Sequence, residues 1–183
     1  MCGTIEKDII MTGYAAMGGI SYILYNRENE IKEHLPGLII NKAKKHIKEN
    51  NVNVYDIIKK ENASAIVRPV SLGGIYKALW NAAEELGTGV TVYQKMIPIR
   101  QEFIEICECY NINPYMFDGK GAFIIISEYG NRIVRMLGRY GVKCVIIGHT
   151  TDNNDKVIIN NDEKRYIESR IVDEMIKIGG SEL

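Results

Sequence analysis

The segment best suited to chemistry is Val70-Ser71-Leu72-Gly73-Gly74, which stands between an expected strand and an expected helix. Glycine costs roughly 0.5–1 kcal/mol in a helix relative to alanine, so two in succession at a helix start need a reason. A helix start offers free N–H groups and the positive end of the helix dipole, which suit phosphate, and Ser71 could cap the helix or donate to an anion. A tight strand-to-helix turn, whose glycines permit close packing, explains the same residues, and spacing alone favours the turn.

Three other polar segments have a structural interpretation beside a chemical one. Asp118-Gly119-Lys120-Gly121 could receive a phosphate, but a hairpin turn between two strands explains it as well and is favoured. Thr150 to Asp155 is rich in oxygen ligands for a hard cation, yet it lacks the glycine and final glutamate of a calcium loop, so a solvated turn is expected. The run Lys42-Lys44-Lys45-His46-Lys48 is expected to be a solvated helix face.

The cysteines and histidines do not form a metal-binding pattern. Cys107 and Cys109 are two apart in an expected helix, so their side chains point to different faces. Free thiols in a reducing compartment are therefore expected. The sequence also lacks GxxxxGK[ST], HExxH and GxSxG, a clear nucleophile–base pair and paired acidic clusters for magnesium, so no catalytic residue and no metal ligand is assigned. The other cysteines and the histidines are Cys2, Cys144, His34, His46 and His149.

Strand patterns alternate with helix patterns along the chain, which predicts a layered α/β domain. Runs such as Phe123 to Ile126 are apolar throughout, so helices should cover the sheet. Strands are expected at 7–12, 63–67, 89–93, 122–127 and 143–147, the last pairing with 157–159. Helices are expected at 17–34, 38–50, 54–62, 75–86, 100–110, 131–140 and 162–178, with Asn50-Asn51 ending the second.

The predicted fold is a mixed sheet of about four to six strands covered by helices. A chain of 183 residues suits one domain over 1–183, with a helical part at 1–62, an α/β core at 63–160 and a C-terminal helix at 161–183. The 23 basic and 23 acidic side chains cancel, which argues against a nucleic-acid partner. No apolar run is long enough to span a membrane, and Glu6, Lys7 and Asp8 stand where a signal peptide would be apolar, so the cytoplasm is expected.

Five segments, in order, resemble one family. They are DIIMTGY (8–14), VSLGGIYKALWNAAEELGTGVTVYQKMIPIR (70–100), the stretch 104–114 with EICECYNINP, GAFI (121–124) and GVKCVIIG (141–148). Together they resemble the C-terminal domain of aminoimidazole-ribonucleotide-synthetase-related proteins. Within that superfamily the chain looks most similar to the hydrogenase-maturation dehydratase branch and its uncharacterised relatives.

The resemblance implies the fold of that C-terminal domain and a division of labour. Family members are two-domain enzymes that use ATP to activate an oxygen of the substrate. Their N-terminal domain carries the magnesium ligands, most of the nucleotide site and the main dimer interface, and this sequence shows no counterpart of it. The resemblance implies that Ser71, Gly73 and Gly74 face the phosphates, with Gly121 near the cleft. ATP and Mg²⁺ are thus implied only together with a partner domain.

Three departures from the family pattern bear on activity. Pro69 and Ser71 replace the usual aspartate and threonine before the Gly-Gly, and Lys120 replaces a frequent acidic residue. The chain ends GGSEL, without the reactive terminal cysteine of the hydrogenase-maturation enzymes. We therefore expect a stand-alone C-terminal-type domain that is not catalytic alone and works with a separate N-terminal half. Alternatives are a non-catalytic binding or assembly module for a phosphorylated metabolite or protein partner, and an enzyme assembled as a homodimer.

Overall fold

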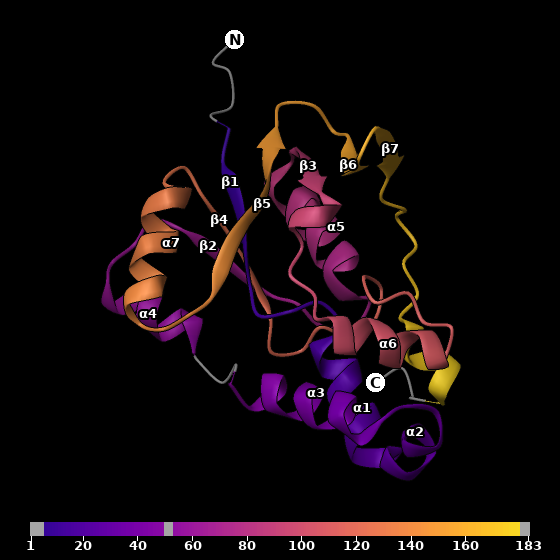
Figure 1. The fold of residues 1–183 in the computed structure, drawn as a ribbon. Coiled ribbons are helices and arrows are strands. Elements are labelled where there is room, and N and C mark those ends of the chain that lie inside the picture. Colours follow the sequence, from indigo (N-terminus) through magenta and orange to yellow (C-terminus); the bar gives the residue numbers. More distant parts are fainter. Residues whose placement is uncertain (1–5, 50–52, 180–183) are drawn as a thin grey trace.

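A computed structural model describes residues 6–49 and 53–179, and in this part of the chain seven strands form one sheet (Figure 1). Cys2, the expected helix end at Asn50-Asn51 and residues 180–183 lie outside the described residues. The strands are β1 (Asp8–Thr12), β2 (Ile66–Pro69), β3 (Gly89–Tyr93), β4 (Phe123–Ser127), β5 (Cys144–Thr151), β6 (Lys156–Asn160) and β7 (Glu163–Tyr166). The α-helices are α1 (Met17–Asn26), α2 (Glu28–His34), α3 (Gly37–Glu49), α4 (Val54–Lys60), α5 (Gly74–Leu86), α6 (Gln101–Cys109) and α7 (Gly130–Arg139), with 3₁₀ turns η1 (Gln94–Met96) and η2 (Glu174–Ile178).

The sheet has the strand order β2-β4-β1-β5-β3-β6-β7, and β3–β6 is a parallel pair among antiparallel ones. The expected mixed α/β sheet is confirmed, although it has more strands than the four to six expected. Two details of the expectation are wrong. Residues 157–159 pair with β3 and β7 rather than with β5. The second is the helix expected over 162–178, because residues 163–166 form the edge strand β7 instead.

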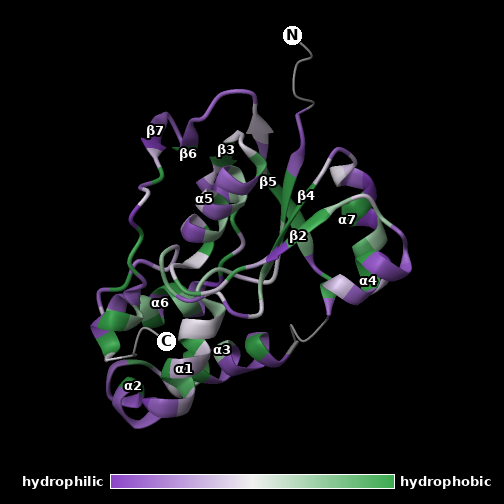
Figure 2. Cartoon of the chain, turned by 180° about the vertical axis from the view of Figure 1, so that it is seen from behind, coloured by the Kyte–Doolittle hydropathy of each residue, from purple (hydrophilic) through white to green (hydrophobic). Residues whose placement is uncertain are grey.

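Helices cover the sheet on both faces because the side chains of its strands alternate. In the central strand β1, Ile9 and Met11 pack in one apolar cluster with α5, while Ile10 packs in another with α4 and α7. Figure 2 shows hydrophobic central strands between helices whose outer sides are hydrophilic. The sequence forms these layers because β4, like β1, is apolar at successive positions and therefore needs cover on both sides.

A third apolar cluster lies beneath the sheet, where α1, α2, α3 and α6 gather (Figure 1). The single helix expected over 17–34 is divided at Arg27, which has φ −131° and ψ 27°. This break starts α2 in a new direction, and Ile31 of α2 is buried in the third cluster. The Arg27 guanidinium donates to the Ile178 carbonyl oxygen at 2.7 Å, which joins this helical layer to the end of the chain.

The helix expected over 162–178 is wrong. Residues 163–166 form β7, which pairs with β6, and the Ile167 N–H donates to the Lys156 carbonyl at 2.8 Å. The chain then runs without regular structure to η2; we call residues 167–178 the strap. The apolar residues four apart do not share one helix face. Ile167 and Ile171 pack in the cluster with α5, whereas Met175 packs in the third cluster.

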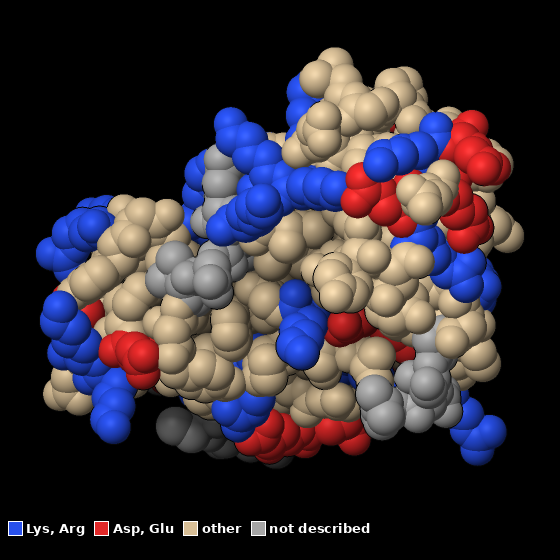
Figure 3. All heavy atoms as spheres, turned by 90° about the horizontal axis from the view of Figure 1, so that it is seen from below, with Lys and Arg blue, Asp and Glu red and all other residues tan. Residues whose placement is uncertain are grey.

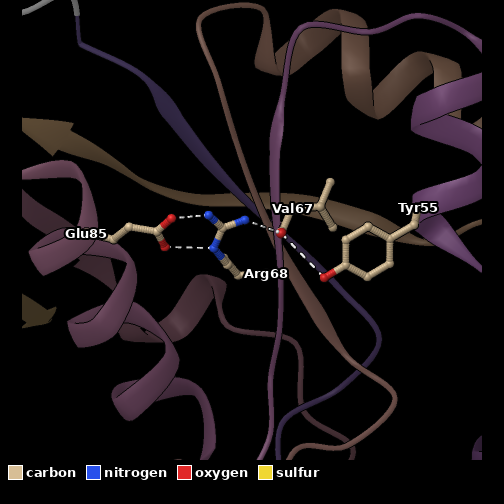
Figure 4. Close-up of polar contacts among 4 residues, drawn as sticks. All are labelled: Tyr55, Val67, Arg68 and Glu85. Carbon is tan, nitrogen blue, oxygen red and sulfur yellow. Dashed lines mark hydrogen bonds and ion pairs between the residues drawn. The ribbon is translucent and has the colours of Figure 1, made fainter.

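The edge strand β2 is tied to α5 by an ion pair (Figure 4). The Arg68 guanidinium donates two hydrogen bonds to the Glu85 carboxylate and a third, at 2.8 Å, to the Val67 carbonyl. Tyr55 of α4 donates to the same carbonyl at 3.4 Å. The strand ends at Pro69, and proline, having no N–H, is tolerated on an edge strand. The contact joins the edge strand to the C-terminal end of α5.

The lysine run of α3 is mostly a solvated face, as expected. Lys42, Lys45 and Lys48 are exposed, and Lys44 pairs with Glu28 of α2 at 2.6 Å. His46 differs, because its Nε2 lies 3.8 Å from the Glu102 carboxylate and its side chain is only 18% exposed. Seen from below, the surface carries basic and acidic groups side by side (Figure 3). Within the described residues, no helix combines the length and apolar character needed to cross a membrane.

Candidate functional site at the paired turns

Two turns that are far apart in the sequence lie side by side, and we call residues 70–74 and 118–121 the paired turns. The Gly119 N–H donates to the Ser71 carbonyl at 3.3 Å, and the Val70 N–H donates to the Ala122 carbonyl at 2.9 Å. The structure thus brings together the four residues singled out from the sequence: Ser71, Gly73, Gly74 and Gly121. The hairpin expected at 118–121 is wrong, because a loop rather than a strand precedes this turn.

Gly73 and Gly74 form a tight strand-to-helix turn in which both residues have positive φ, 83° and 64°. A Cβ at Gly74 would lie 2.4 Å from the Tyr115 carbonyl oxygen and 2.8 Å from that of Phe117. The loop backbone therefore packs directly against the start of α5, and the Tyr76 N–H donates to the same Tyr115 carbonyl at 3.2 Å. Close backbone approach is the reason that glycine is required here.

Ser71 and Gly121 lie on the outer side of this arrangement. Ser71 is exposed, and its carbonyl also accepts the Gly74 N–H at 3.0 Å. Serine often caps a helix, but Ser71 does not cap α5, because the N-cap is Gly73 and no side-chain cap bond forms. Gly121 has φ 103°, and a Cβ there would lie 2.7 Å from the Met17 methyl carbon at the start of α1. Its place is fixed by α1 as well as by β4.

The strap contributes a residue that sequence reasoning missed, Asp173. Its carboxylate accepts the Gly73 N–H at the start of α5 and, through Oδ1, the Met175 N–H at 2.6 Å. A negative group at a helix N-terminus is favourable because of the free N–H groups and the dipole. An aspartate directly before a 3₁₀ turn could be recognised as a cap from sequence. Its contact with a glycine 100 residues away could not.

Asp118 of the second turn lies close to this carboxylate. Burial raises the pKa of Asp118, and the charge of Asp173 raises it further, while the Lys120 N–H, donated at 3.0 Å, opposes the shift. Burial likewise raises the pKa of Asp173 against the two N–H groups it accepts, and Lys77 also lowers it. The α5 start therefore already binds one carboxylate, with a second nearby.

A hollow of about 330 Å³ adjoins the α5 start, between the loop at 113–116, β7 and the strap. One wall is a stacked pair of rings, Tyr76 and Tyr115, with centroids 5.4 Å apart. Burial raises the pKa of Tyr76 to about 12, so its hydroxyl stays neutral, and Arg165 also lines the hollow. The hollow is within the size range of small-molecule sites.

The other candidate segments have structural roles. The solvated turn expected over 150–155 is confined to residues 152–155, because Thr150 and Thr151 belong to β5 and Thr150 is buried. In this turn Asn153 Oδ1 accepts the Asp155 N–H at 3.0 Å. Cys107 is buried, and burial raises its pKa to about 12, so its thiol is inert. Among the residues that the structure describes, no group of three or more His, Cys, Asp and Glu side chains could hold a metal ion.

Comparison with solved structures defines the fold. Hydrogenase maturation protein HypE in complex with ATP matches with a TM-score of 0.69 and 13% identity, over 94% of this chain and 52% of HypE. Thiamine-monophosphate kinase from Aquifex aeolicus matches with a TM-score of 0.57 and 14% identity, over 89% of this chain and 52% of the kinase. The chain has the aminoimidazole-ribonucleotide-synthetase-related fold, which confirms the resemblance noted in the sequence.

One protein that this chain resembles in sequence is named for hydrogenase expression and formation. The chain is 27% identical over 181 residues to this protein of Methanocaldococcus jannaschii, covering 94% of this chain and 49% of that relative. A chain of the HypE–HypF complex matches with a TM-score of 0.64 and 15% identity, over 88% of this chain and 52% of that chain. No family model matches the chain. The chain spans about half the length of these relatives, consistent with a C-terminal-type domain.

Proposed function

We propose that this chain acts as the C-terminal-type half of an ATP-dependent, HypE-like protein and is not catalytic alone. An N-terminal-type half would supply the magnesium ligands and most of the nucleotide contacts. One observation carries the proposal: the match covers nearly the whole chain but only about half of each relative. HypE has been solved with ATP, which supports a nucleotide as the ligand of the assembled protein.

The paired turns are the part of the chain that would face the nucleotide phosphates. Ser71, Gly73, Gly74 and Gly121 lie together there, and the α5 start supplies N–H groups and the helix dipole. A carboxylate on the Gly73 N–H supports this assignment, because it demonstrates that the α5 start accommodates a negative oxygen.

A chimera tests the proposal. This chain would replace the matching half of the M. jannaschii relative, and ATP binding and Mg²⁺-dependent hydrolysis would be measured for the chimera, the intact relative and the chain alone. We expect the chimera to bind ATP as the intact relative does, and the chain alone to show no hydrolysis. A folded chimera that fails to bind ATP when the intact relative binds it contradicts the proposal, as does sustained hydrolysis by the chain alone.

A matched pair of substitutions locates the site within the chimera. Ser71→Asp places a negative charge on the exposed part of the paired turns, and Ser64→Asp places one on an exposed serine before β2. Because like charges repel, the first change should weaken ATP binding by about tenfold and the second by much less. Equal effects would remove the paired turns from the site.

A second function, an assembly module for a protein partner, is favoured by one comparison. HypE has been solved in a complex with HypF. Light scattering of this chain, alone and with the remaining half of the relative, separates the possibilities of homodimer, complex with the other half and monomer. A chain that binds a protein partner but, in the chimera, no ATP would favour this second function.

A further inference from the structure

The start of α5 is filled from within the chain, and the strap supplies the group that fills it. Asp173 is 7% exposed, and its two carboxylate oxygens accept N–H groups from Gly73 and Met175. The Gly74 N–H is taken by Ser71 and that of Tyr76 by Tyr115. A phosphate approaching this helix start therefore meets three N–H groups, those of Gly73, Gly74 and Tyr76, that already have acceptors.

The strap is held by hydrogen bonds near both ends and by the packing of Ile171 between them. Its first residue, Ile167, bonds to β6, and Ile171 packs with α5. At the far end the Glu174 N–H donates to the Met116 carbonyl at 3.2 Å, and the Glu174 carboxylate accepts the Asn113 N–H at 3.2 Å. The residues adjoining Asp173 on its N-terminal side are largely exposed: residues 168–170 and Val172. The strap contacts Gly73 through the Asp173 side chain, so this side chain can leave Gly73 while Ile171 and Glu174 stay in place.

We propose that the strap is an internal competitor for anions at the α5 start: Asp173 must leave the Gly73 N–H before a phosphate can take its place. This inference rests on the proposed function, since it concerns the same phosphate. A phosphate carries more negative charge and more acceptor oxygens than a carboxylate, so it can displace one. Lys77, which faces both Gly73 and Asp173, would remain to pair with the incoming anion.

Asp118 provides the matched control for this mechanism. Its carboxylate lies near that of Asp173 and repels an incoming phosphate in the same way, but it accepts the Lys120 N–H rather than that of Gly73. Removing Asp118 lowers the local negative charge and leaves the Gly73 N–H occupied. Removing Asp173 lowers the charge by the same amount and also frees that N–H.

Backbone amide NMR of the full 183-residue chain, titrated with inorganic phosphate, tests the inference. We expect the Gly73 amide of Asp173→Ala to saturate at a phosphate concentration about tenfold lower than in the unchanged chain, and that of Asp118→Ala to move less. If Asp173→Ala does not fold, Asp173→Ser keeps a hydroxyl cap for Met175 on a shorter side chain.

The outcomes distinguish the competitor role of Asp173 from the phosphate site itself. If Asp118→Ala strengthens phosphate binding as much as Asp173→Ala does, charge alone explains the effect. The proposal that Asp173 competes with phosphate is then overturned. Equal saturation in the unchanged chain and Asp173→Ala also overturns it, while the phosphate site stands. A Gly73 amide that responds to phosphate in no variant overturns the phosphate site of the proposed function, and this inference with it.

Discussion

Asp118 is a carboxylate that its surroundings make harder to ionise, because burial and the nearby Asp173 both raise its pKa. A carboxyl with a raised pKa in the folded state binds protons more readily folded than unfolded. It therefore favours the folded state below its unfolded pKa, which is about 3.9 for aspartate, and that contribution is lost as pH rises through the folded pKa. Ionised Asp118 is thus a stability cost at neutral pH.

Asp118→Asn should raise the free energy of unfolding at pH 7, because the amide keeps an oxygen for the Lys120 N–H and removes the charge. The gain should shrink as pH falls toward 4, where the wild-type carboxyl is increasingly neutral in both states. Urea unfolding across this pH range measures the difference. Asp152→Asn, in the exposed turn after β5, is the control and should change stability by less than about 0.5 kcal/mol. A destabilised Asp118→Asn at pH 7 would contradict this account.

At the scale of elements, the strap shows what local pattern could and could not predict. Ile167, Ile171 and Met175 are four apart, as on a helix face, yet β7 pairing and two separate apolar clusters determine their positions. The order of strands and helices through residue 160 was largely readable because each has its own periodicity. Sequence could not predict the pairing of β6 with β3 or the contact of Asp173 with Gly73, because both depend on residues far apart in sequence.

Two isoleucines in and near η2 test the strap's packing. Ile171→Ala should lower the free energy of unfolding by about 2 kcal/mol or more, because the side chain is 8% exposed and packs in the cluster with α5. Ile176→Ala should cost less than about 0.5 kcal/mol, because its side chain is 59% exposed. Urea unfolding at one pH compares them. Similar costs would mean that the strap is not anchored by Ile171.

For the whole molecule, the expectation of one domain over 1–183 remains a prediction, and cooperativity tests it. β1 has side chains in two apolar clusters, and the strap joins one of these to the third. Unfolding should therefore be a single transition. Trp80, the only tryptophan, reports on the cluster with α5, and far-ultraviolet circular dichroism reports mainly on the helices. The two urea curves should coincide. Separate midpoints would divide the molecule into independently unfolding parts.

The ion pair on β2 has a consequence for how this protein can associate. Exposed outer strands are templates for extending a sheet from one molecule into the next. On one side, two side chains already occupy the Val67 oxygen and Pro69 has no amide hydrogen to offer. On the other, β7 presents exposed residues of both charges. Both edges of the sheet therefore disfavour extension by a strand from another molecule. We expect a partner to bind through side-chain surfaces instead.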